Sequence, residues 1–203
     1  MRPQTAALAA AAARIVVEEG LEYGAAKRKA GKTARGSPRA VLPSSEAVED
    51  EVRAYLALFC DETQPAELRT LRQLALRWMA RLAEFRPHLS GAAWRGTATR
   101  LSALHLDLYC DDPKAMEITL INQGIEYDSS SLPSSHPGQR GEPVNVLSLA
   151  EYSEALRDTV TLHLSVRDLE DLRGALKPDA RGRSWRGDAS ALRRLLDDDG
   201  ARP

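Results

Sequence analysis

The chain has 203 residues, of which 43% are apolar and 28% charged, an ordinary composition for a globular protein of one domain plus a helical extension. Its 28 basic and 29 acidic side chains give a net charge of −1, which excludes an overall positive field that gathers nucleic acid but not a local basic patch. No apolar stretch approaches the roughly 20 residues that span a bilayer. Glu18 and Glu19 directly follow the alanine-rich start, so we expect neither a signal peptide nor a membrane segment, and a cytoplasmic protein. Cys60 and Cys110 lie in apolar runs and are predicted to be buried thiols.

The first part of the chain is predicted to be helical. Residues 4–30 consist mostly of strong helix formers, and Gly20 and Gly24 weaken the end of this helix. The stretch at 27–39, KRKAGKTARGSPR, is basic and contains glycine. Its composition favours a solvated connector over a contact with phosphate or nucleic acid.

Two amphipathic helices are predicted next. Ser44 or Ser45 supplies an N-cap for a helix whose apolar residues recur at three- and four-residue steps as far as Phe59. A second helix begins near Pro65, which suits a first helical turn, and runs to about Glu84. Apolar and aromatic side chains at this spacing are more typical of a core than of a ligand pocket.

After Pro87 the residue pattern changes from helical spacing to alternation, and strands are predicted. Residues 104–110 read LHLDLYC, a strict alternation that indicates a strand, and Asp112 is predicted to cap the helix that follows and ends at Gly124. The remaining predicted elements are strands at 125–128, 144–149 and 159–166, a mobile loop at 129–141, and helices at 168–176 and 188–196.

These elements predict an α+β fold, a mixed sheet with packed helices that follows an α-helical N-terminal region. We place the helical region at residues 1–84 and the α/β domain at residues 85–203. The basic segment 181–188 is predicted to be a loop in which Trp185 packs and Asp188 caps the last helix. Contact with a nucleotide through charge and stacking is the alternative for this segment.

Residues 88–109, HLSGAAWRGTATRLSALHLDLY, resemble the signature of the nucleotidyltransferase superfamily, the DNA polymerase β-like fold. In that family a short strand ends in Gly-Ser, a helix containing Arg-Gly follows, and the next strand reads Ser-Asp-hydrophobic-Asp-hydrophobic. Here Gly91 matches the glycine, Ala92 stands at the serine, and Arg95 and Gly96 match the Arg-Gly step. The resemblance implies a phosphate site at these four residues, in which free N–H groups at a helix start attract the anion.

The same alignment places Ala103 and His105 where the two catalytic aspartates belong. The family transfers a nucleotide with two divalent ions held by carboxylates, and Mg²⁺ prefers oxygen ligands. Ala103 offers no ligand and His105 offers nitrogen. Asp107 lies on the same strand face and is the surviving acid, with Asp111 or Asp112 as a second acid in a shifted arrangement. The family's third acid falls, on strand order, at Asn145.

The resemblance therefore implies a nucleotide-binding, nucleotidyltransferase-like protein whose metal site is degenerate. If it is active, His105 and Asp107 are the catalytic candidates, with Asp107 as ligand of Mg²⁺. The alternative is an inactive pseudo-enzyme that acts as a protein-interaction or regulatory module. A further hypothesis joins His105, His163 and Asp107 in a metal site, against the more common case of strand histidines with structural partners. The sequence leaves nucleic acid as a partner, and the oligomeric state, open.

Overall fold

The computed structural model describes residues 3–33, 41–132, 143–179 and 181–200. The chain divides into two compact units, which we call the helical unit (Met1–Leu68 with Thr97–Ser102) and the sheet unit (Arg69–Gly96 with Ala103–Pro203). The predicted connector beyond residue 33 and most of the predicted loop at 129–141 lie outside the described residues. None of the helices described is both long enough and apolar enough to cross a membrane.

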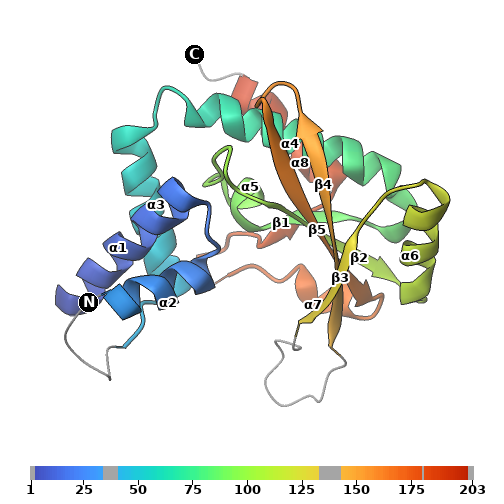
Figure 1. The fold of residues 1–203 in the computed structure, drawn as a ribbon, viewed down its shortest axis with the longest axis horizontal. Helices are drawn as coiled ribbons and strands as arrows, with labels where there is room; N and C mark the ends of the chain where they lie inside the picture. The colour runs from blue at the N-terminus through green and yellow to red at the C-terminus, as the bar shows by residue number, and fades with distance from the viewer. Residues whose placement is uncertain (1–2, 34–40, 133–142, 180, 201–203) are drawn as a thin grey trace. The chain divides into compact units, whose positions relative to one another are not determined.

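The helical unit is built on three helices, α1 (Pro3–Glu19), α2 (Tyr23–Thr33) and α3 (Ser45–Phe59), with α1 packed against both others (Figure 1). The single helix predicted at 4–30 is divided at Gly20, whose φ of 69° is costly for any residue with a side chain. Ser44 caps α3 by accepting a hydrogen bond from the Ala47 N–H at 3.1 Å, as predicted. Small side chains let the helices approach closely, and the buried core consists of Leu8, Ala9, Ala12, Ala13, Val16, Val17, Ala26, Ala30, Val48, Val52 and Leu56.

The sheet unit contains a six-stranded mixed sheet in the order β3-β4-β5-β2-β1-β6 (Figure 1). Its neighbours pair antiparallel except for β2 and β5, which run parallel. The predicted α+β fold class is therefore confirmed. The strands are β1 (His88–Ser90), β2 (Leu104–Cys110), β3 (Asp128–Leu132), β4 (Val144–Ser153), β5 (Asp158–Asp168) and β6 (Arg186–Gly187).

Several helices and their caps follow the sequence prediction. The sheet unit holds α5 (Gly91–Arg95), α6 (Pro113–Asn122), α7 (Asp171–Ala175) and α8 (Ala189–Gly200), and the 3₁₀ turn η1 (Ala83–Phe85). Helix α4 (Gln64–Arg81) starts in the helical unit and continues into the sheet unit. Asp112 caps α6 by accepting from the Lys114 N–H at 2.9 Å, and Asp188 accepts from the Ala191 N–H at the start of α8.

Two predicted boundaries are wrong for reasons of strand pairing. The strand predicted at 125–128 begins only at Asp128, because 128–132 pair with 144–148 of β4 in spite of their serine-rich, loop-like composition. The helix predicted at 168–176 is reduced to Asp171–Ala175, because β5 stays paired with β2 as far as Asp168. In both places the hydrogen bonds of the sheet outweigh a weak local preference.

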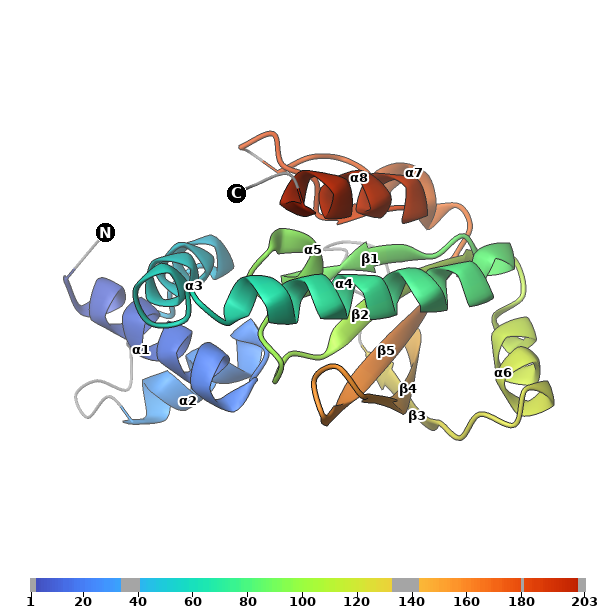
Figure 2. The same cartoon turned by 90° about the horizontal axis from the view of Figure 1, so that it is seen from above.

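One face of the sheet is apolar and forms the core of the sheet unit. Register aligns Leu147, Leu164, Leu106 and Leu89 across four strands, and all four are fully buried. Helices α4 and α8 lie side by side (Figure 2), joined by a hydrogen bond from Arg69 to the Leu196 carbonyl. They complete this core with the buried side chains Leu71, Leu74, Ala75, Trp78, Met79, Leu82, Leu192 and Leu196.

A buried arginine fixes the short helix α5 in this core. Arg72 of α4 is 4% exposed, and its guanidinium donates to the carbonyl oxygens of Ala93 and Trp94 at 2.9 and 3.2 Å and pairs with Asp199. The two carbonyls lie at the end of α5, where backbone acceptors have no partner within the helix. Arg72 thus satisfies the end of α5 and ties it to α8.

We expect Arg72→Ala to destabilise the protein by about 2 to 4 kcal/mol, because it leaves two buried carbonyls and the Asp199 carboxylate without their donor. Arg77→Ala, on the exposed side of the same helix, is the matched control and should change the free energy of unfolding by at most about 0.5 kcal/mol. Urea unfolding of both variants measures the difference. Equal effects in the two variants would contradict the assignment of Arg72.

Candidate functional site

The other face of the sheet is polar, and it carries the residues that the sequence singles out. Parallel pairing of β2 with β5 sets His105 opposite His163, Asp107 opposite Ser165 and Tyr109 opposite Arg167. Cross-strand partners project to the same face, so these side chains lie together. His105, His163 and Ser165 are only half-buried, whereas Asp107 and Tyr109 are buried.

The turn between β1 and α5 brings Gly91 against His105. Gly91 has a φ of 68°, and a Cβ built on it would lie 3.1 Å from His105 Cδ2, so a side chain here would strain the backbone and crowd the His105 ring. The Ser90 hydroxyl donates to the His105 carbonyl at 3.4 Å. The structure therefore has the strand-turn-helix-strand order that the resemblance implies. The turn glycine lies against His105, at the position where the family has its second catalytic aspartate.

The two histidines form a pair with its own hydrogen-bond partner. Their ring centroids lie 5.0 Å apart with planes inclined at 30°, and His163 Nδ1 is 2.8 Å from the Ser148 hydroxyl. Asn145 does not join them. It is in register with Val166, on the apolar face, and donates to Glu117 of α6 at 3.0 Å. The expected convergence of Asn145 with His105 is wrong, because strand order does not fix the face that a residue occupies.

Asp107 is held between two arginines. The carboxylate is 4% exposed, with Oδ1 2.8 Å from Arg167 Nε and Oδ2 3.0 Å from Arg186 Nη1. Arg186 also donates to the Tyr109 hydroxyl at 2.7 Å. Burial, and then the charge of Asp107, raise the pKa of Tyr109, so its hydroxyl stays protonated and neutral. We call Asp107, Tyr109, Arg167 and Arg186 the arginine cluster. It holds two guanidinium groups and one carboxylate, and the charge of Asp171 also acts on Arg167.

This donor set does not fit Mg²⁺. The ion needs negatively charged oxygen ligands. Where the family has its two catalytic aspartates, this chain has Ala103 and the imidazole of His105. Asp107 already has two hydrogen-bonded counter-charges, which a cation would have to displace. Among the residues that the structure describes, no group of three or more His, Cys, Asp or Glu side chains is arranged to hold a metal ion.

Phosphate binding by Gly91, Ala92, Arg95 and Gly96 stays a prediction, and the structure gives two of these residues structural contacts. The buried Arg95 guanidinium pairs with the buried carboxylate of Asp179 at 3.2 Å and lies 4.7 Å over the Trp185 ring. Gly96, with a φ of 81°, ends α5 and donates its N–H to the Ala92 carbonyl. Gly91 is exposed and Ala92 half-buried at the start of this five-residue helix.

A hollow lies at the carboxyl ends of the parallel strands β2 and β5. It measures about 570 Å³ and is lined by Asp111, Leu169, Glu170 and Arg173. The carboxyl ends of neighbouring parallel strands are a common place for ligands in α/β sheets. The shifted metal arrangement that joins Asp107 with Asp111 is not formed, because Asp111 lines this hollow while Asp107 is enclosed by the arginine cluster.

Sequence reasoning missed Arg167, and it included Arg186 only as part of the basic segment 181–188. Arg167 continues the alternation Thr161, His163, Ser165 of β5, so its face could have been read from the sequence, but its partner could not. Arg186 comes from a strand of two residues, for which no pattern exists. The polar alternation of β5 was therefore the one available signal.

Comparison with known proteins yields similarity of fold alone. No protein-family model matches the sequence, and no curated protein is similar to it. Two solved structures are similar, Cid1 in complex with the UTP analog UMPNPP (TM-score 0.35) and the Cid1 poly(U) polymerase with MgGTP bound (TM-score 0.36). Both are 11% identical to this chain and cover 59% of it, and the chain spans only 36% and 38% of their lengths. Function has to be argued from this chain's own residues.

We expect Gly91→Ala to destabilise the sheet unit more than Gly124→Ala does. Both glycines have positive φ, 68° and 66°, so both variants carry a backbone cost of about 1 to 2 kcal/mol. Nothing lies within 4 Å of a Cβ at Gly124, whereas the one at Gly91 presses on His105. Chemical denaturation measures the difference, and His105→Ala combined with Gly91→Ala should abolish it. An equal cost at both glycines would show that His105 does not restrict this turn.

Proposed function

We propose that the sheet unit is a nucleotidyltransferase-like, nucleotide-binding domain that does not carry out metal-dependent nucleotide transfer. The observation that carries the proposal is the arginine cluster. At the place where the resemblance leads us to expect carboxylates and divalent ions, this chain has Asp107 paired with Arg167 and Arg186.

Charge and exposure support binding of a nucleotide at this face. Within the cluster two guanidinium groups face one carboxylate, and planar guanidinium groups are well suited to phosphate oxygens. The half-buried rings of His105 and His163 offer a flat surface for a base beside it.

The absence of transfer follows from the same residues. Nucleotidyl transfer needs ions that neutralise the developing charge and orient the attacking and leaving oxygens. Arginine can bind and orient a phosphate, but it cannot lower the pKa of an acceptor hydroxyl by coordinating it. Magnesium is accordingly a cofactor only in the alternative in which the protein is active.

We expect ATP, GTP, CTP or UTP to stabilise the full chain to the same extent with Mg²⁺ and with EDTA, without release of pyrophosphate. At 100 times Kd the stabilisation amounts to about 2.7 kcal/mol, which corresponds to roughly 5 to 10 °C in Tm. Thermal unfolding and a pyrophosphate assay measure the two outcomes. Pyrophosphate release that is lost in Asp107→Ala would establish an enzyme and overturn the proposal.

Arg186→Gln tests the cluster directly. Because it removes one of the two guanidinium groups while Arg167 still neutralises Asp107, we expect affinity for the stabilising nucleotide to fall by roughly tenfold or more. Arg77→Gln, an exposed arginine of α4, is the control and should leave the affinity unchanged. Isothermal titration gives both dissociation constants. Unchanged affinity in Arg186→Gln would place nucleotide binding elsewhere.

The alternative function is a protein-interaction or regulatory module. It is favoured by two large apolar side chains of α3 that face solvent, Leu58 (71% exposed) and Phe59 (63%). A chain that responds to none of the four nucleotides would support this alternative. We further propose two domains, a helical N-terminal one and an α/β one, with α4 shared between the predicted ranges 1–84 and 85–203 because its residues from Arg69 onward belong to the sheet unit. We also propose a cytoplasmic location, with which the free thiols of Cys60 and Cys110 agree.

A further inference from the structure

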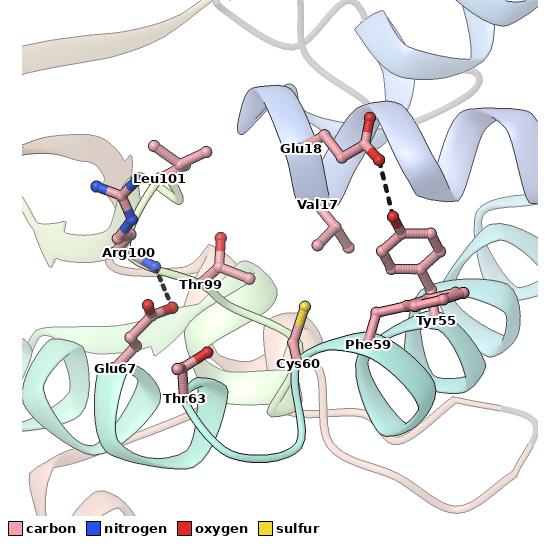
Figure 3. A pocket seen from close by; sticks show the side chains of 10 residues that line it. All are labelled: Val17, Glu18, Tyr55, Phe59, Cys60, Thr63, Glu67, Thr99, Arg100 and Leu101. Carbon is pink, nitrogen blue, oxygen red and sulfur yellow. Dashed lines mark hydrogen bonds between the residues drawn. The ribbon is translucent and has the colours of Figure 1, made fainter.

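The helical unit contains a pocket of its own, lined by α1, the end of α3, the start of α4 and the segment Thr97–Ser102 (Figure 3). It measures about 280 Å³, close to the lower limit for small-molecule sites. All of its lining residues belong to the helical unit, so it is separate from the proposed nucleotide site.

One wall of the pocket is aromatic. The rings of Tyr55 and Phe59 lie 4.6 Å apart, inclined at 45°, and Phe59 remains 63% exposed. Val17 and Leu101 add aliphatic surface, and Figure 3 shows these side chains around the opening. A flat apolar group placed here would cover an aromatic ring that now faces water.

The depth of the pocket holds an unsatisfied hydroxyl. Thr99 is 6% exposed, and among the described residues its Oγ1 has no hydrogen-bond partner. Figure 3 shows this oxygen directed into the pocket between Val17 and Leu101. Buried hydroxyls are normally hydrogen-bonded, so this one calls for a partner supplied from outside the chain.

The backbone of the segment that carries Thr99 is held on both sides. The carbonyl of Ala98 accepts from the buried Gln64 side chain at 2.9 Å. The N–H of Arg100 donates to Glu67 at 2.9 Å, and the N–H of Thr99 donates to the Ser102 hydroxyl at 3.0 Å. The hydroxyl is thus presented on a rigid support.

The lining of the pocket holds two carboxylates, Glu67 and Glu18, and one guanidinium, Arg100, so its net charge disfavours an anionic ligand. The carboxylate of Glu67 lies beside Thr99 and Thr63 (Figure 3). Hydrogen bonds from Tyr55 and Arg14 lower the pKa of Glu18, which therefore stays negative at the rim. Burial, with the charge of Glu67, raises the pKa of the Cys60 thiol, so the sulfur stays neutral.

We propose that this pocket binds a small aromatic alcohol or amine, with its ring against Phe59 and Tyr55 and its polar group hydrogen-bonded to the Thr99 hydroxyl. The aromatic wall selects the ring. The unsatisfied hydroxyl selects the polar group. The two carboxylates of Glu67 and Glu18, against the one guanidinium of Arg100, disfavour a negative charge on it.

Benzyl alcohol, benzylamine and benzoate test the selectivity, because they share the ring and differ in the charge of the polar group. We expect the first two to shift the backbone amide NMR signals of residues 99–101 in the full chain, and benzoate to bind at least roughly tenfold more weakly. Shifts of equal size with benzoate, or no shifts with any of the three, would overturn the proposal.

Thr99→Val tests the hydroxyl, since valine has nearly the same shape. We expect the empty protein to gain stability, because an unsatisfied polar group is removed, and affinity for benzyl alcohol to fall roughly fivefold. Thr161→Val, at an exposed position of β5, is the control that should change neither. Unchanged affinity in Thr99→Val would overturn the assignment.

Phe59→Ala provides a second test. Because Phe59 is exposed, its replacement leaves the buried core unchanged, and we expect the variant to fold. It should weaken benzyl alcohol and benzylamine alike, since both lose the ring contact. Equal affinity in this variant and the unaltered chain would mean that the aromatic wall is not part of the site.

Discussion

The carboxylate of Asp107 is the electrostatic constraint on which the arrangement of the sheet unit depends. It is buried on β2, and the charges that compensate it come from β5 and from β6, on either side. An uncompensated charge at this depth would be strongly destabilising. Strand β6 has only two residues, and so few backbone hydrogen bonds hold a strand poorly. The ion pair of Arg186 with Asp107, across β1, therefore adds to the pairing that holds this segment on the sheet.

The same constraint determines what chemistry the polar face permits. A divalent ion at Asp107 would have to compete with two guanidinium groups that already contact both carboxylate oxygens. A phosphate meets the opposite situation, because the cluster offers two guanidinium groups against one carboxylate. Guanidinium groups hold their donors in a fixed plane, which suits recognition, but they cannot take the place of a metal in polarising an acceptor. Binding and catalysis are thus separable at this site.

Local signals in the sequence were sufficient for individual elements but not for their pairing. The alternation LHLDLYC fixed β2 to the residue, and the caps at Ser44 and Asp112 follow from side chains within three positions of the N–H groups they accept from. The strand register is a non-local property. It decided that Asn145 faces α6 instead of His105, and that Arg167 meets Asp107. The candidate site was therefore predictable in its location and not in its electrostatics.

The histidine at position 105 and the arginines have to be considered together. An aspartate at position 105 would add a second carboxylate to Asp107. Two carboxylates would only balance the two guanidinium groups of Arg167 and Arg186, so they would not give the negative charge that a metal site needs. A neutral face does not attract a divalent cation, whatever the geometry of its oxygens. The imidazole also fills the space beneath Gly91, which a shorter acid would leave open. On the proposed function, two features oppose a divalent ion at this site, the absent acids and the two guanidinium groups, and changing either one alone would not create a metal site.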